Sequence, residues 1–466
     1  MRVFASLVTI LIGCGGSGSN DDDTMVGGSF TSTSFNIPAA GNGSIALLAY
    51  GGPLVAVDGD RVLASGLVSF DVSASQREDS RTLTALEGGE VQFVKRYTYP
   101  NTFDVRPSSI VSDGAGGAYL AATRLYTGQS YVSEPVITHF DASGAVTWSR
   151  SYATSSMAQW NLPQISGLFG YTNVPDVTLS SIIDGKLAVI AGSCAMVIDT
   201  AGNVQWAQQF PGQTALAQLR ADADGFTIWG FLYDALLVIR YDWTGTVVSY
   251  RQAPGSVRGG MTFSTPHQRA DGNLVIGWDT FDELNLPISG AIVFDPGGAV
   301  IDDFTFQLQA SYDPRQTMRA VSQPSRIRFL SDDLATSHHT YKEGLRPPFR
   351  DVGLDIVFQT SATGDAVSPA IFSARAEGAW FRLGDGSVYT VASLGVGYGG
   401  IGASCATNYV AIDSLTKGPS AGVIQPLVAA SVAPTVITVT PAEEPVTVTD
   451  AGMVTATETG SQTCSE

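Results

Sequence analysis

Two short turn signatures recur along most of this 466-residue chain. The first is an Asp-Gly dipeptide between apolar, β-branched runs. Such a dipeptide is a strong hairpin signal, because a type I′ turn needs positive φ at both central residues. Six copies occur, and Asp332-Asp333 stands where a further one is expected: Asp58-Gly59, Asp113-Gly114, Asp184-Gly185, Asp224-Gly225, Asp271-Gly272 and Asp385-Gly386.

The second signature is an Asp followed by Gly three residues later and by Val five residues later. The four clear copies are THFDASGAVTW (138–148), VIDTAGNVQW (197–206), IRYDWTGTVVSY (239–250) and IVFDPGGAVIDDF (292–304). Asp and Gly are turn residues, so each copy predicts a second strand–turn–strand unit. Residues 86–93 are a degenerate copy that keeps Gly89 and Val91, and Tyr409–Asp413 begins another copy with a longer turn.

Together the signatures predict seven repeats between about Gly52 and Leu427, each with two hairpins and therefore four short strands. Repeats of this length with four strands each are typical of propeller blades. We therefore predict an all-β chain that folds as a seven-bladed β-propeller of four-stranded antiparallel blades. Two stacked β-sandwiches and a β-solenoid are the alternative architectures.

The blade signature resembles that of bacterial lipoprotein propellers with Asp-x-x-Gly-x-x-x-Trp blades. It is more distantly similar to that of quinoprotein propellers, whose turn is one residue longer. In this chain Trp148 and Trp206 lie seven residues after the turn Asp, where the quinoprotein pattern has eight. We expect both tryptophans to anchor the core rather than to contact a cofactor.

The first fourteen residues, MRVFASLVTILIGC, have one basic residue, an apolar run and a small residue before a cysteine. This is the layout of a secretory signal. The Leu11-Ile12-Gly13-Cys14 box resembles the bacterial lipoprotein signal, which implies cleavage before Cys14 and lipidation of that cysteine. Residues 1–13 are thus expected to be a signal peptide and 14–29 a flexible Gly/Ser/Asp tether. With Gly15 after the cysteine, the resemblance implies the outer membrane.

The propeller is expected to span residues 30–430 and a Thr/Val/Pro-rich tail residues 431–466. The tail alternates Val or Ile with Thr, a pattern that fits either an edge hairpin or a disordered segment. We expect poor order, because the tail follows seven complete blades. Cys405 and Cys464 are a candidate disulfide that would attach it to the last blade, and export makes oxidation plausible.

Charge and composition exclude one class of partner. The net charge is −18 and only four lysines occur, whereas nucleic-acid binding requires basic patches. The N-terminal apolar run is also shorter than the roughly 20 residues of a spanning helix. The expected partners are the membrane, through the N-terminal lipid, and an envelope protein or glycan.

In an antiparallel meander, successive turns alternate between two ends. Both turn signatures therefore fall on one face, and the longer connections fall on the other, among them Tyr152–Asp176 and Tyr341–Asp355. Long loops on a rigid scaffold commonly bind ligands. The candidate binding residues on that face are Trp160, Phe169, Tyr171, Tyr341, Arg346, Phe349 and Arg350.

No residue pattern indicates a catalytic or metal site. His338 and His339 are neighbours in an expected strand, where they face opposite sides, and His139 and His267 are isolated in the sequence. Asp222 and Asp224 lack the other ligands of a calcium loop. No cofactor is predicted.

The leading interpretation is a non-catalytic, lipid-anchored scaffold of the bacterial cell envelope that binds a protein or another ligand. The alternative is a propeller enzyme, either a quinone-dependent dehydrogenase or a glycan-active enzyme. Because propellers support many functions, the fold alone does not decide between them.

Overall fold

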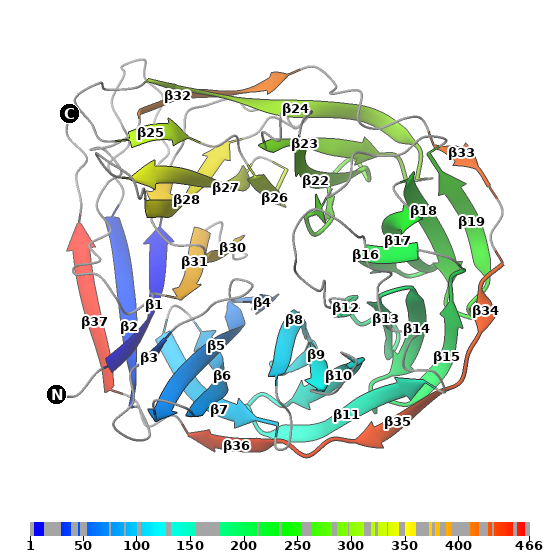
Figure 1. Cartoon of the computed structure of the whole chain (residues 1–466), viewed down its shortest axis with the longest axis horizontal. Helices are drawn as coiled ribbons and strands as arrows, with labels where there is room; N and C mark the ends of the chain where they lie inside the picture. The colour runs from blue at the N-terminus through cyan, green and yellow to red at the C-terminus, as the bar shows by residue number, and fades with distance from the viewer. Residues whose placement is uncertain are drawn as a thin grey trace.

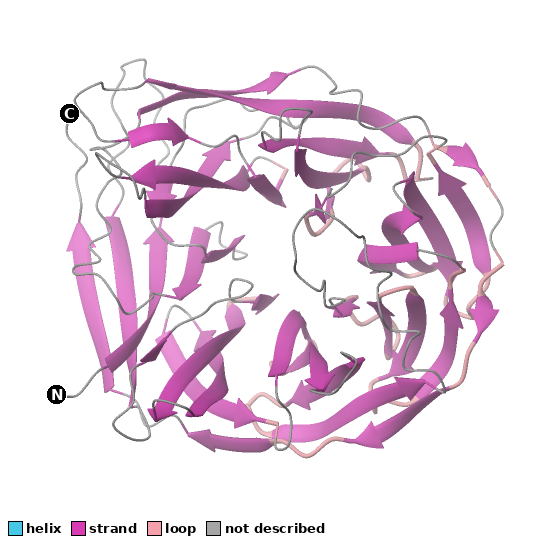
Figure 2. Cartoon of the chain, in the orientation of Figure 1, coloured by secondary structure: helices cyan, strands magenta, loops and turns pink. Residues whose placement is uncertain are grey.

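A computed structural model of the chain shows seven antiparallel sheets arranged as blades around a ring (Figure 1). The described segments are strands, turns and loops, with no helix among them (Figure 2). The predicted seven-bladed β-propeller is confirmed. The structure describes residues 4–13, 29–38, 45–46, 54–73, 76–87, 90–99, 104–126, 132–154, 177–211, 214–232, 235–253, 262–281, 287–296, 298–311, 318–321, 325–332, 334–343, 350–359, 372–374, 378–382, 388–393, 411–418, 427–430, 433–450 and 454–461.

Blades 1 to 6 each take their inner strands from one stretch of chain. Blade 1 contains β3 (Ile45–Ala46), β4 (Leu54–Asp58), β5 (Arg61–Ser73), β6 (Gln76–Glu87) and β7 (Glu90–Thr98). Blade 2 contains β8 (Asp104–Ser112), β9 (Ala118–Tyr126), β10 (Val132–Phe140) and β11 (Val146–Thr154). Blade 3 contains β12 (Val177–Leu179), β13 (Lys186–Ala191), β14 (Cys194–Asp199) and β15 (Val204–Gln209).

The next three blades repeat this meander. Blade 4 contains β16 (Thr214–Asp222), β17 (Gly225–Leu232), β18 (Ala235–Asp242) and β19 (Val247–Gln252). Blade 5 contains β20 (Thr262–Phe263), β21 (His267–Gln268), β22 (Leu274–Phe281), β23 (Pro287–Phe294) and β24 (Val300–Ser311). Blade 6 contains β25 (Met318–Val321), β26 (Ser325–Ser331), β27 (Leu334–Glu343), β28 (Arg350–Gln359) and β29 (Phe372–Ala374).

Blade 7 combines both ends of the chain. Its inner strands are β30 (Gly378–Arg382) and β31 (Val388–Ser393), and next come β1 (Phe4–Gly13) and β2 (Ser29–Pro38). The prediction that Tyr409–Asp413 begins the second hairpin of this blade is wrong. Residues from Ala411 instead form β32 (Ala411–Gly418) on the outer edge of blade 5, since the N-terminal strands occupy the place beside β31.

The C-terminal residues form a belt, which we define as strands β32 to β37. The other five are β33 (Val428–Ala429), β34 (Thr435–Val436), β35 (Val439–Glu443), β36 (Thr447–Asp450) and β37 (Val454–Ser461). They pair in turn with β19, β15, β11, β7 and β2, and Figure 1 shows them in orange to red along the rim.

The belt corrects two expectations. In six of the seven sheets the belt adds one strand at the outer edge, beyond the four strands of the predicted meander. The expectation of a poorly ordered tail is also wrong for 433–450 and 454–461, whose Val/Thr alternation pairs with blade edges. Cys405 and Cys464 lie outside the described residues.

The hydrophobic core consists of clusters that lie between adjacent blades. Between blades 2 and 3, Ile137 and Tyr152 pack with Leu187 and Met196, and all four side chains are almost completely buried. Equivalent clusters join blades 1 and 2, 3 and 4, 4 and 5, and 5 and 6. A blade therefore buries its two faces against its neighbours. None of the described residues belongs to a helix long and apolar enough to cross a membrane.

The Asp-x-x-Gly turn has one geometry in each blade where it is described. In blade 3, Gly202 N donates to Asp199 O at 2.9 Å, and Gly202 has a φ of +81°. The Asp199 carboxylate accepts hydrogen bonds from the backbone N–H groups of Ala201 and Asn203. A bulge in the preceding strand accompanies the turn in blades 1 to 5. The repeat thus encodes a turn capped by Asp and completed by a left-handed Gly.

The Asp-Gly dipeptides are less uniform than predicted. Both residues of Asp184-Gly185 have positive φ, +49° and +71°, as a type I′ turn requires. In blade 1 the strand pair instead closes at Asp58 and Arg61, so Gly59 and Asp60 are the central residues. The uniform type I′ prediction is therefore wrong, because the exact strand ends decide which residues occupy the turn. The segment around Asp385-Gly386 lies outside the described residues.

An aromatic side chain of one blade packs against the Asp-x-x-Gly turn of the next. A Cβ added at Gly202 would lie 2.9 Å from the Trp148 ring, and one at Gly245 would lie 2.9 Å from the Trp206 ring. Trp148 Nε1 also donates to Thr200 O at 3.0 Å. The expected anchoring role of the two tryptophans takes the form of a partly buried contact between neighbouring blades.

We predict that Gly202→Ala destabilises the protein more than Gly185→Ala does. Both glycines have positive φ, so each alanine pays roughly 1–2 kcal/mol of backbone strain. A Cβ at Gly185 has nothing within 4 Å, whereas one at Gly202 overlaps Trp148 and adds about 1–3 kcal/mol. Denaturant unfolding measures both costs. In a Trp148→Ala background the difference between the two substitutions should shrink, because the atoms closest to the added Cβ belong to that ring. An undiminished difference would contradict the docking contact.

Candidate functional site

The residues expected to bind a ligand fall mostly in segments that the structure does not describe. Trp160, Phe169, Tyr171, Arg346 and Phe349 lie outside the described residues. Tyr341 and Arg350 lie near the facing ends of β27 and β28, where Tyr341 pairs with Val352 and Arg350 with Glu343. The connection between these strands is thus shorter than the expected Tyr341–Asp355. It comprises residues 344–349, because the strand pair continues to Glu343 and Arg350.

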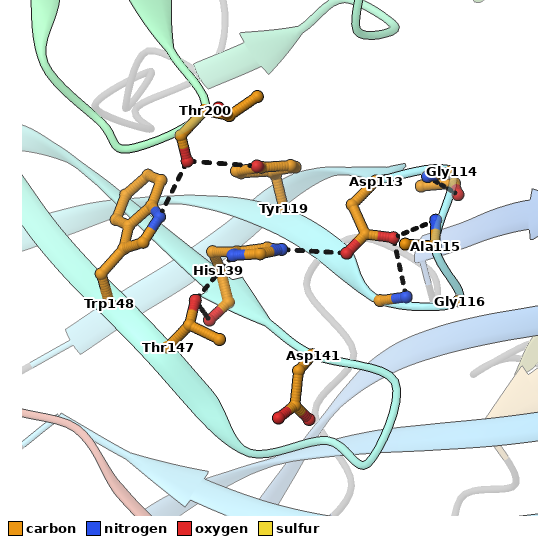
Figure 3. A network of polar contacts seen from close by, with 12 residues as sticks. Asp113, Gly114, Ala115, Gly116, Tyr119, His139, Asp141, Thr147, Trp148 and Thr200 are labelled. Carbon is orange, nitrogen blue, oxygen red and sulfur yellow. Dashed lines mark hydrogen bonds and ion pairs between the residues drawn. The ribbon is translucent and has the colours of Figure 1, made fainter. Parts of the chain in front are cut away.

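The face formed by the Asp-x-x-Gly and Asp-Gly turns can be followed in atomic detail. In blade 2 the turn residues Asp113 and Asp141 lie at the same end of the sheet, as the meander requires (Figure 3). The Asp141 carboxylate bonds within its own turn, where Asp141 Oδ1 accepts hydrogen bonds from Ser143 N and Ala145 N.

A hydrogen-bonded chain on this face joins a carboxylate, an imidazole and a hydroxyl (Figure 3). His139 Nε2 lies 3.0 Å from Asp113 Oδ2, and His139 Nδ1 lies 2.6 Å from Thr147 Oγ1. The imidazole stacks on Tyr119, with ring centroids 4.2 Å apart, and it lies 6.1 Å from the Trp148 ring. Tyr119 and Trp148 both donate to Thr200 O of blade 3, which ties the chain to the neighbouring blade.

The environment of Asp113 favours its charged form. Burial acts to raise its pKa, but hydrogen bonds from His139 and from the backbone N–H groups of Ala115 and Gly117 outweigh burial. The pKa of Asp113 therefore lies below its ordinary value. By contrast, burial raises the pKa of Tyr119 to about 12, so its hydroxyl stays protonated. The residues around His139 thus include a charged carboxylate, that of Asp113, and a neutral phenol, that of Tyr119.

The order carboxylate–imidazole–hydroxyl is also found in hydrolases with a hydroxyl nucleophile. Two observations favour a structural role for these hydrogen-bonded residues of blade 2. The Thr147 hydroxyl has a second partner, the His139 carbonyl oxygen at 3.2 Å. In blade 4, moreover, Arg240 lies two residues before its turn Asp, as His139 does, and it forms an ion pair with Asp222 at 2.6 Å. In both blades, therefore, the side chain two residues before the turn Asp bonds to the carboxylate of the preceding turn, and blade 4 has Arg in place of His.

The sequence analysis did not identify the pairs between turn-face carboxylates and basic side chains, which are Asp113–His139, Asp222–Arg240 and Asp332–His267. His139 and His267 were expected to be isolated, yet His267 Nε2 lies 2.8 Å from Asp332 Oδ1, and this contact joins blade 5 to blade 6. Asp332 also accepts a hydrogen bond from Ala270 N. A His or Arg two residues before the turn Asp was the available signal in blades 2 and 4. No such spacing links His267 to Asp332, because the contact forms between different repeats.

The described residues contain no group of three or more His, Cys, Asp or Glu side chains placed to hold a metal ion. His338 and His339 occupy consecutive positions of β27, as expected for neighbours in a strand. Asp222 and Asp224 are turn residues, and Asp222 Oδ1 accepts a hydrogen bond from Asp224 N. The thiol of Cys194 is buried, which raises its pKa to about 12 and keeps it protonated.

No protein-family model and no curated protein matches the chain. Similar solved structures include a protein of unknown function from Bacteroides caccae, at 12% identity over 58% of this chain and 81% of that chain, with a TM-score of 0.31. The WD40 domain of Neurospora crassa Pan2 aligns at 12% identity over 74% of this chain and 89% of that chain, with a TM-score of 0.32.

A structure from a study of two prolyl endopeptidases aligns at 9% identity over 76% of this chain and 55% of that chain, with a TM-score of 0.26. Similarity at these TM-scores carries no functional argument. The strand topology itself defines the class of protein, which is a seven-bladed β-propeller.

We predict that His139→Gln destabilises the protein by about 1.5–3 kcal/mol, the usual range for a hydrogen bond to a charged group. Thr147→Val should cost less, because the His139–Asp113 bond remains. Denaturant unfolding tests this order. An esterase activity that Thr147→Val abolishes at unchanged stability would instead make the chain a catalytic triad.

We also predict that the stabilising effect of Asp113 depends on pH. Its folded-state pKa is lowered, so the carboxylate stabilises the fold above its unfolded pKa of roughly 3.9, and this stabilisation is lost as the pH falls through the folded-state value. The difference in unfolding free energy between wild-type protein and Asp113→Asn should therefore shrink as the pH falls from about 6 to about 3. A constant difference over this range would contradict the proposed role of the charge.

Proposed function

We propose that this β-propeller is a non-catalytic scaffold, anchored by lipid in the bacterial cell envelope, that binds a protein or glycan through the face of its long connections. The observation that carries the proposal is the difference between the two faces. On the turn face, the carboxylates of Asp113, Asp199 and Asp242 are each occupied by hydrogen bonds within the fold.

The opposite face carries the segments that vary in length between blades. The second and third strands are joined by residues 127–131 in blade 2, by Gly192 and Ser193 in blade 3 and by residues 344–349 in blade 6. Varying loops on a constant scaffold are where binding residues usually lie. Residues 155–176, which join blade 2 to blade 3, belong to the same face. Together these connections support a binding role for Trp160, Phe169, Tyr171, Tyr341, Arg346, Phe349 and Arg350, of which Tyr341 and Arg350 lie at the strand ends that flank 344–349.

The proposed lipid anchor rests on the Leu11-Ile12-Gly13-Cys14 box. Acyl chains on Cys14 would contribute about 0.8 kcal/mol for each CH₂ buried in the bilayer. The full chain has residues 4–13 as strand β1, which cleavage before Cys14 would remove. A mature protein either keeps residues 4–13 as strand β1 or loses them by cleavage. The mass of the N-terminal peptide distinguishes these two forms.

We also propose that Cys405 and Cys464 form a disulfide. The belt begins with β32 on blade 5 and ends with β37 on blade 7, and blade 6 lies between these blades. Cys405 precedes Ala411 by six residues, and Cys464 follows Ser461 by three. A bridge would close the belt covalently and stabilise the fold by on the order of 4 kcal/mol in a chain-entropy estimate.

We predict that Cys14→Ser moves the protein from the membrane fraction to the soluble fraction, because lipidation is lost. Cys194→Ser serves as the matched control, since Cys194 is a buried thiol of blade 3 and should leave the fractionation unchanged. Fractionation and the mass of the mature N-terminus are the measurements. Equal membrane retention of both variants would end the anchoring proposal.

We predict that replacing residues 344–349 by a two-residue Asn-Gly turn preserves folding, since a short loop can close an antiparallel pair. It should abolish capture of envelope proteins or glycans that the wild-type protein retains. Lys186→Ala, on the turn face, is the control and should retain them. Unchanged capture by the shortened loop would assign binding to another surface. Turnover of a sugar or alcohol with added quinone or metal would favour the alternative of a propeller enzyme.

A further inference from the structure

The belt strands pair with the outer strands of the blades in a fixed register. Lys95 of β7 pairs with Asp450 of β36, and Arg150 of β11 pairs with Glu443 of β35. Both pairs are also ion pairs, with Lys95 Nζ 2.5 Å from Asp450 Oδ1 and Arg150 Nε 3.1 Å from Glu443 Oε1. Exposed ion pairs contribute only about 0–1 kcal/mol each, so these two specify which residues pair rather than supply most of the attachment.

The same two cations belong to the contacts between blades. Lys95 lies over the ring of Phe93 at 5.9 Å, and Arg150 lies over the ring of Trp148 at 5.8 Å. Phe93 packs against the Gly144 turn of blade 2, where an added Cβ would lie 2.7 Å from its ring, as Trp148 packs against the Gly202 turn. Each cation thus follows an aromatic residue that contacts the next blade by two positions. The belt is therefore attached at the positions where one blade contacts the next. Lys95 and Arg150 take part in both kinds of contact.

Apolar belt residues cover the outer ends of the cores between blades. Val439 is buried and Ile437 is half-buried against the cluster of blades 2 and 3. Val446 and Val448 pack on the cluster of blades 1 and 2, and Leu427 packs on that of blades 4 and 5. The backbone of Glu444 bonds to Ser149 O at 2.9 Å, and its side chain is buried. The belt therefore spans the joints between blades as well as their edges.

The ring closes within blade 7, where N-terminal strands pair with C-terminal strands at two places. β1 pairs with β31 on one side and with β2 on the other. β2 also pairs with β37 over eight residue positions, from Ser29–Ser461 to Asn36–Val454. The N-terminal strand β2 is thus attached to the ring both through β1 and through the belt.

We infer that in the mature protein the belt, and not β1, holds the N-terminal strand β2 against the ring. The inference rests on the proposed removal of residues 1–13. Without β1, the remaining described partner of β2 is β37. Through β37, strand β2 stays connected to the belt on blades 1 to 5, even when the strand between β31 and β2 is removed.

The pairing offers matched substitutions. Thr33 of β2 faces Thr9 of β1 on one side and Thr457 of β37 on the other, and Ser34 faces Val8 and Ala456 in the same way. Proline removes a backbone donor, and consecutive residues of a strand donate to opposite sides. At the adjacent positions Val8 and Thr9, and likewise at Ala456 and Thr457, at least one of the two prolines therefore removes a backbone hydrogen bond to β2.

The experiment measures hydrogen exchange of the β2 amides, residues 29–36, in the mature chain from residue 14 with Cys14→Ser. Every second amide should be protected, because only the side facing β37 is paired. Ala456→Pro and Thr457→Pro, made separately, should between them accelerate exchange of the protected amides by at least about tenfold. In a full chain carrying Cys14→Ser, Val8→Pro and Thr9→Pro should leave those amides protected.

Two outcomes would overturn the inference. One is rapid exchange of all β2 amides in the mature chain, which needs no substitution to detect. The other is loss of protection in the full chain with proline in β1 but not with proline in β37. The N-terminal mass of protein from the cell envelope tests signal cleavage separately, so failure of the anchoring proposal is distinguishable from failure of the belt to hold β2.

Discussion

The contact between an aromatic side chain of one blade and the glycine turn of the next is the constraint on which the ring depends. Trp148 fits beneath the turn of Gly202 because that residue has no Cβ, and Trp206 fits beneath Gly245 for the same reason. The turn in turn needs its Asp, whose carboxylate holds two backbone donors. One spacing in the sequence therefore fixes both the turn within a blade and the place where the aromatic side chain of the neighbouring blade packs against it.

The sequence was informative where structure is local. The spacing of Asp199 and Gly202 predicts their turn, since both the capping carboxylate and the left-handed residue are within four positions. The strand ends around Asp58 were not predictable, because a shift of one residue changes which side chains occupy a turn. The partners of His139 and His267 form through space, and one of them crosses to another blade. The Val/Thr pattern of the tail indicated strands, but only the outer blade edges specify where such strands pair.

The same construction separates the two faces of the ring. Charged groups of the turn face, such as Asp113, Asp222 and Asp332, are engaged by His139, Arg240 and His267. A surface whose donors and acceptors serve the fold has few of them left for a ligand. The connections on the other face share neither turn signature in the sequence, so their length and composition are free to vary. The proposed binding residues and the stabilising turns thereby lie at opposite ends of the same strands.

The belt also has a consequence for the order of events during synthesis. Its strands are encoded at the end of the chain, yet β37 pairs with β2 near the start, so some of the longest sequence separations in the fold occur in its final contacts. Blades 1 to 6 can each form from contiguous chain as it emerges, whereas the outer edges wait for the last residues. Contacts of such separation form slowly. Until residues 411–461 are synthesised, the outer edges of blades 1 to 5 lack their belt strands, and an unpaired edge is a place where other chains can add.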